Sequence, residues 1–197
     1  LGRFEEATTS FGQVIGMGQG WEQQAQLELA GTLADRGRRP EALMELAGLV
    51  SSGCTPIEAE ALFASALIHR QVAQERSRRD DKAAANEANT AARRLLKRLV
   101  LLYPFEELTP LPQLAYLELA EIAAELDENE AAQSELGQLI DKYPADLCAE
   151  YARAVLEADH RRLGDALARV RRLADQPLDD RLASRVEALV RYLESKQ

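Results

Sequence analysis

Few residues of this chain have the type and spacing that metal binding or thiol chemistry requires. It has two histidines, His69 and His160, and two cysteines, Cys54 and Cys148, all far apart in the sequence. A zinc site on a helix needs two histidines four positions apart, and cysteine ligands come in close pairs. Neither spacing occurs. We therefore expect no metal site, and we interpret both cysteines as buried structural thiols.

Catalytic motifs are also missing from the sequence. It contains no glycine-rich phosphate loop, no nucleophile elbow, and no His in the Ser or Cys context that acyl transfer needs. The 33 acidic residues will form pairs by chance in a helical protein, so paired carboxylates alone do not indicate an enzyme. We expect a protein that is not an enzyme and holds no cofactor.

The charge distribution is the one feature that bears directly on partners. Nine acidic residues and no Lys or Arg lie between Phe105 and Glu135, whereas eight basic and three acidic residues lie between Arg76 and Arg98. These runs fit either two solvated helix faces or a bipolar surface that orients a protein partner. The net charge of −9 argues against a general nucleic-acid surface, because phosphate contacts need a basic stripe.

Helices must carry these side chains, because one apolar pattern recurs along the chain. Five times an alanine is followed four and seven positions later by large apolar residues, which places all three on one helix face. The first two alanines are 35 residues apart and the last two are 34 apart, a period typical of helix-turn-helix repeats. The five copies are Ala7/Phe11/Val14, Ala42/Leu46/Leu49, Ala92/Leu96/Leu99, Ala132/Leu136/Leu139 and Ala166/Val170/Leu173.

A second amphipathic helix precedes each of the later copies, so the pattern predicts an all-α chain of antiparallel helix pairs. Glycines before the copies and prolines after them predict the turns: Gly2, Gly37 and Gly164, then Pro104, Pro144 and Pro177. The abundance of Ala and Leu, with only 5% aromatic residues, also favours stacked helices over a sheet. No apolar run is long enough to insert into a membrane.

The spacing also predicts how the single repeat domain is divided. We expect a partial repeat at 1–19, full repeats at 20–54, 55–104, 110–144 and 145–177, and a closing helix at 178–196. The third repeat is long and has no Pro or Gly from Leu62 to Tyr103, which predicts about two extra turns on each of its helices. The next repeat also has more residues than the period requires, and these extra residues fall in the proline-containing loop FEELTPLP. Because the first repeat lacks its first helix, we expect an excerpt of a longer protein.

The repeats resemble the tetratricopeptide repeat family. The resemblance is carried by segments such as LELAGTLADRGRRPEALMELAGLV, LELAEIAAELDENEAAQSELGQLIDKYP and LGDALARVRRLADQP, and with their partner helices they cover nearly the whole chain. It implies a right-handed superhelix whose concave groove, lined by the first helix of each pair, holds a segment of another protein. The partner-binding residues that it implies are Gln24, Leu27, Gly31 and Asp35 in the second repeat and Leu117, Glu121 and Glu125 in the fourth.

The family resemblance also bears on the function class. The LLYP and IDKYP endings resemble repeats of bacterial envelope proteins that organise outer-membrane assembly or polysaccharide export. We therefore expect a protein-binding scaffold in the periplasm, and a cytoplasmic location stays open. Two other functions remain open as well: a regulatory or substrate-recruiting module fused to an enzyme, and a module that self-associates through its exposed ends.

Overall fold

The computed structural model describes residues 2–17, 21–50, 55–103 and 110–196 of the chain. These residues form ten α-helices and no β-strand, which confirms the predicted all-α class. The chain divides into two compact units, Leu1–Leu111 and Pro112–Gln197. Among the described helices, none combines the length and the hydropathy that a membrane span requires.

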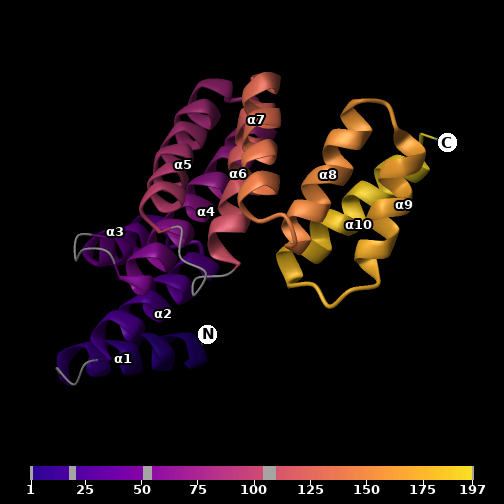
Figure 1. The fold of residues 1–197 in the computed structure, drawn as a ribbon. Helices are drawn as coiled ribbons and strands as arrows, with labels where there is room; N and C mark the ends of the chain where they lie inside the picture. Colours follow the sequence, from indigo (N-terminus) through magenta and orange to yellow (C-terminus); the bar gives the residue numbers. More distant parts are fainter. Residues whose placement is uncertain (1, 18–20, 51–54, 104–109, 197) are drawn as a thin grey trace. The chain divides into compact units, whose positions relative to one another are not determined.

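The helices of the first unit pack in sequence order (Figure 1). Each helix contacts the next one, and α2 also contacts α4, so neighbouring helices form pairs. Thr55 caps α4, because its hydroxyl oxygen accepts a hydrogen bond from the backbone N–H of Glu58 at 3.2 Å. The helices are α1 (Gly2–Met17), α2 (Glu22–Asp35), α3 (Arg39–Val50), α4 (Pro56–Arg78) and α5 (Lys82–Leu102).

Within the second unit, neighbouring helices also pack in chain order. Lys142 of α7 donates a hydrogen bond to the Tyr116 hydroxyl of α6 at 2.5 Å. Helices α7, α8, α9 and α10 then contact one another in order, and α10 also contacts α8. Asp146 and Asp179 cap the starts of α8 and α10 by accepting backbone N–H bonds. The helices are α6 (Leu111–Glu125), α7 (Asn129–Lys142), α8 (Leu147–Asp159), α9 (Leu163–Ala174) and α10 (Asp180–Glu194).

The turns inside four of the helix pairs share one backbone conformation. Each turn holds one residue in the left-handed region, and the residue after it donates its N–H to the carbonyl five positions back. Arg38 donates to Leu33 at 2.9 Å in this way, and Glu128 donates to Ala123 at 2.8 Å. The bond satisfies a carbonyl that the end of the helix leaves unpaired. The left-handed residues are Gly37 (φ 75°), Asp80 (φ 61°), Asp127 (φ 59°) and Arg161 (φ 59°).

Glycine occupies only one of these four turn positions. Our prediction of turns at Gly2 and Gly164 is wrong, because these residues lie within α1 and α9. Before α9 it is Arg161 that adopts the left-handed conformation. The predicted turns at Pro144 and Pro177 do lie between helices, whereas Pro104 is outside the described residues. Of the loop predicted at 105–112, positions 105–109 lie outside the described residues.

The third helix pair is longer than the second, as predicted. Helices α4 and α5 have 23 and 21 residues, against 14 and 12 in α2 and α3. Counted from the turn, the equivalent of Ala42 is Ala85, because each lies five positions after the left-handed residue. Ala92, two helical turns further on, is also fully buried. The extra turns are therefore added at the Asp80 end of this pair.

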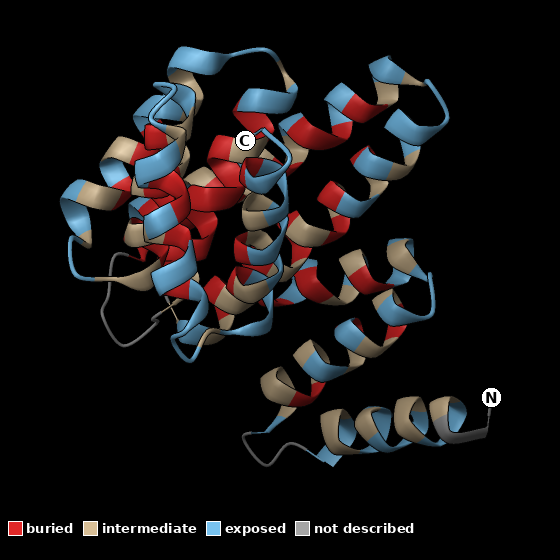
Figure 2. Cartoon of the chain, turned by 90° about the vertical axis from the view of Figure 1, so that its right-hand side faces the viewer, coloured by how far each residue is buried: buried red, intermediate tan, exposed pale blue. Residues whose placement is uncertain are grey.

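The repeating apolar residues form the core, which Figure 2 shows as buried positions along the facing sides of the helices. Of the five alanines, Ala42, Ala92 and Ala166 are fully buried, but Ala132 is only half-buried. Phe11 and Val14, the large apolar residues of the first copy, are also half-buried. The large apolar residues of the other four copies are all buried: Leu46, Leu49, Leu96, Leu99, Leu136, Leu139, Val170 and Leu173.

Each predicted full repeat holds one helix pair. Repeat 20–54 contains α2 and α3, repeat 55–104 contains α4 and α5, repeat 110–144 contains α6 and α7, and repeat 145–177 contains α8 and α9. The partial repeat contains α1, and the predicted closing helix is α10. The helices therefore fall within the predicted ranges, although two of the turn glycines lie within helices.

Candidate binding groove

A groove of about 190 Å³ lies among three helices of the second unit. Helices α6, α7 and α8 each contribute one wall of lining residues. Most of the lining surface is apolar. The lining residues are Leu117, Ala120, Glu121 and Ala124 of α6, Asn129, Ala132 and Leu136 of α7, and Tyr151, Val155 and Asp159 of α8.

Small side chains explain why this space is not filled. Ala120, Ala124 and Ala132 all face the groove, and none of them reaches across it. Ala132 is the alanine of the fourth copy, and its half-buried state follows from this position. The alanines of the second, third and fifth copies are fully buried, whereas the groove lies over Ala132.

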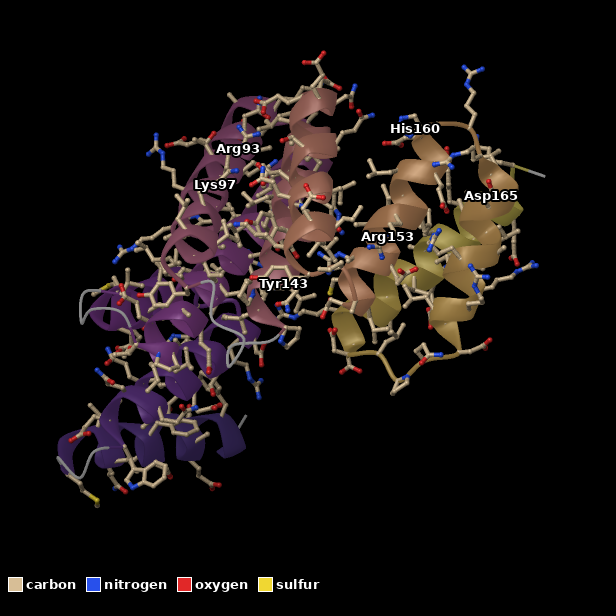
Figure 3. The ribbon with its side chains drawn as sticks, viewed as in Figure 1. Arg93, Lys97, Tyr143, Arg153, His160 and Asp165 are labelled. Carbon is tan, nitrogen blue, oxygen red and sulfur yellow. The ribbon has the colours of Figure 1, made fainter. Side chains whose placement is uncertain are left out.

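One end of the groove is acidic. The charged residues of the lining are Glu121 and Asp159, and no Lys or Arg is among them. Asp159 is the last residue of α8, and α6 ends at Glu125, four positions after Glu121. The carboxyl end of a helix already carries partial negative charge, so acidic residues there reinforce it. In Figure 3 the label of His160, the residue after Asp159, marks this end of α8.

An arginine from the closing helix reaches the α6 wall. Arg185 of α10 donates from Nη2 to Glu118 Oε1 at 2.5 Å and from Nε to Glu121 Oε1 at 2.6 Å. The Arg185 side chain is only 14% exposed and that of Glu118 only 8%, so the pair is largely shielded from water. Removing one partner of such a pair destabilises the fold, because the other partner is left as a buried, unpaired charge.

These charges shift the pKa values of their neighbours. Burial lowers the pKa of Arg185, but Glu121 and Glu118 raise it by more, so the net shift is upward. Burial raises the pKa of Tyr151 to about 12, and the negative charge of Glu121 adds to this effect. Burial also lowers the pKa of Arg181, one turn before Arg185, although Glu118 acts in the opposite direction.

A second charge network joins α8 to α9 on a different face of α8. Arg169 of α9 binds Glu157 through two hydrogen bonds of 2.8 and 3.0 Å, and it binds Glu150 at 2.6 Å. Glu150 also pairs with Arg153, which Figure 3 labels on α8. The hydrogen bonds from Arg169 lower the pKa of Glu157. These contacts hold α8 in place without using the residues that line the groove.

The predicted groove residues of the second repeat lie in the first unit, on α2. Leu27 packs against the hydrophobic core there, and Gln24 donates a hydrogen bond to Glu28 at 3.1 Å. Asp35 is exposed and is the last residue of its helix, and Gly31 is also exposed. No lining residue of the groove described above comes from this helix.

Two of the three predicted residues of the fourth repeat do line the groove. Leu117 is buried in its wall, and Glu121 is half-buried beside it. Glu125 is exposed and is not part of the lining. Arg185 already binds the Glu121 carboxylate, so Glu121 and Glu125 do not form a joint acidic site in the groove.

Sequence reasoning missed the α8 wall and the arginine. Tyr151, Val155 and Asp159 recur every four positions, a helical spacing that marks one face of α8. This spacing was a usable signal. Arg185 gave none, because it lies 64 residues from Glu121 and its pairing depends on how the helices fold back.

The described cysteine and the two histidines, whose side chains could bind a metal or react, do not line the groove. Cys148 is buried, and burial together with nearby Asp146 raises its pKa, as expected for a structural thiol. Cys54 lies outside the described residues. Burial lowers the pKa of His69, and His160 is exposed with its Nδ1 2.6 Å from the Leu156 carbonyl oxygen. Among the described residues, no three His, Cys, Asp or Glu side chains cluster closely enough to hold a metal ion.

Comparison with known proteins gives no family assignment. No family model matches the chain, and no curated protein or solved structure shows a significant match to it.

Proposed function

We propose that this chain is a non-enzymatic scaffold that binds a segment of another protein in the groove between α6, α7 and α8. The observation that carries this proposal is the groove itself. It is concave, mostly apolar, and has a few polar groups at one end, which is the usual composition of a binding site. The same groove contains Leu117 and Glu121, which the family resemblance selected independently.

The repeated helix pairs support the same function. Four pairs share one turn conformation, and the helices of each unit pack in chain order. Stacked pairs of this kind form extended binding surfaces in repeat proteins. We therefore propose a right-handed superhelix similar to a tetratricopeptide array, with the first helix of each pair facing the partner.

Site-specific photo-crosslinking tests this function. A photoreactive phenylalanine analogue at Ala124, an exposed residue of the groove, should crosslink to a discrete second polypeptide in cells that produce the protein. The matched control is the same analogue at Ala168, an exposed alanine of α9 outside the lining, which should give no such product. Equal products from both positions would refute groove binding, and products formed only with a second copy would indicate self-association instead.

A further inference from the structure

The size of the groove limits what can enter it, and this step rests on the proposed function. The groove measures about 190 Å³, and its apolar lining includes Leu117, Leu136 and Val155. An engineered apolar cavity of about 150 Å³ accommodates benzene. The groove therefore has room for one large apolar side chain, such as that of Leu, Met or Phe, but not for a whole helix.

The charges beside this space favour a cation. Glu121 and Asp159 line the groove, whereas no Lys or Arg does. Asp159 also stands at the carboxyl end of α8, where the helix dipole disfavours an acidic residue. A bound Lys or Arg would offset both the carboxylate and the helix end.

The chain already shows one guanidinium bound to this wall. Arg185 pairs with Glu118 and Glu121. The negative charge of Glu118 also acts on Arg181, where it raises the pKa against the effect of burial. Arg185 thus binds two carboxylates of α6. Of the two lining carboxylates, Asp159 is the one that Arg185 does not bind.

From these observations we infer that the groove recognises a protein segment in which one large apolar side chain is followed closely by a Lys or Arg. The apolar side chain enters between Leu117 and Val155. The cation lies at the end of α8, beside Asp159. Hydrophobic burial supplies the anchor, and charge complementarity sets the direction in which the segment binds.

A random peptide library displayed on phage provides the probe. The full chain is panned against the library, and the most enriched peptide is synthesised with a fluorescent label. Its Kd is then measured by fluorescence anisotropy for the native chain and for four variants. Two variants alter the groove, Ala124→Leu and Asp159→Lys, and two are exposed controls on α9 and α10, Ala168→Leu and Glu187→Lys.

We expect enriched peptides to share a large apolar residue next to Lys or Arg. Ala124→Leu should weaken binding about tenfold or more because it fills the groove. Asp159→Lys should weaken it about fivefold or more, although Tm should not fall, because a Lys suits the carboxyl end of a helix. The controls should change Kd by less than about twofold.

Several results would overturn the inference. Enrichment of acidic peptides, or native affinity in Asp159→Lys, would show that the cation is not recognised, while crosslinking from Ala124 would still support the proposed function. Native affinity in Ala124→Leu would show that the peptide binds elsewhere. Failure to enrich any peptide, together with failure of the crosslink, would contradict both proposals.

Discussion

Glu121 and Glu125 differ in role although they lie one helical turn apart. Glu121 is half-buried and holds Arg185, whereas Glu125 is exposed at the end of α6. Charge reversal at Glu121 would therefore place a Lys next to an arginine and disturb the contact between α6 and α10. Reversal at Asp159 avoids this problem, which makes it the better probe of a cationic partner.

Tyr151 gives a pH-dependent prediction at the scale of one residue. Its pKa is raised from 10.0 to about 12, so the native state holds the phenolic proton more tightly than the unfolded state does. Between pH 10 and 12 the unfolded chain loses this proton first, and the free energy of unfolding should fall as pH rises. The group's stabilisation is fully present below pH 10.

The comparison with Tyr151→Phe isolates this contribution. Urea unfolding followed by circular dichroism at several pH values from 9 to 12 should give a shallower alkaline decline for the variant, because its side chain cannot ionise. Cys148 also has a raised pKa, but it is present in both proteins and cancels in the comparison. Equal slopes for the two proteins would show that Tyr151 is not shielded as described.

The helix pairs could be predicted from the sequence because their apolar residues repeat at helical spacing. The large residues of the last four copies are all buried, and the long third pair was predicted from the missing Pro and Gly. The turns were less predictable, because glycine is only the easiest residue to place at positive φ. Asp80, Asp127 and Arg161 adopt that conformation without any such signal.

The turn before α9 therefore offers a stability test at the scale of an element. Arg161→Gly should stabilise the chain by about 0.5–1 kcal/mol, because glycine tolerates φ of 59° without the steric cost of a side chain. At Gly37, where φ is 75°, Gly37→Ala should destabilise by about 1 kcal/mol for the converse reason. Urea unfolding curves measure both changes.

The control for this test is the same Arg→Gly change inside a helix. Arg172 is exposed in α9, and Arg172→Gly should destabilise by about 1 kcal/mol, since glycine is a poor helix former. The two Arg→Gly substitutions, eleven positions apart, should therefore change the free energy of unfolding in opposite directions. Destabilisation by both changes would mean that the left-handed conformation of Arg161 is not retained in solution.

Long-range pairing sets the arrangement of the second unit as a whole. Arg185 joins the last helix to the first one of this unit, and Glu118 and Glu121 are 67 and 64 residues away from it. A repeat period describes contacts between neighbours, so it predicts the stacking of α8 on α7 but not this connection. The groove depends on the stacking of α8 on α7 and on the connection through Arg185, because α6 provides one of its walls.

A double-mutant cycle on Arg185 and Glu118 measures the strength of this connection. Arg185→Met should destabilise the chain by about 2–4 kcal/mol, because it leaves Glu118 buried beside an apolar side chain. Glu118→Gln in the Arg185→Met background should cost much less than in the native chain, since the unpaired charge is then gone. We expect a coupling energy of about 1–3 kcal/mol from urea unfolding of the four proteins.

An exposed ion pair of the same unit provides the control for this cycle. Arg171 of α9 pairs with Glu194 of α10 at 2.7 Å, but both side chains are about half exposed, at 58% and 45%. Arg171→Met should therefore cost less than about 1 kcal/mol. If Arg185→Met were equally mild, the closing helix would be held by apolar packing alone, and the wall of the groove would not depend on the charges of α6.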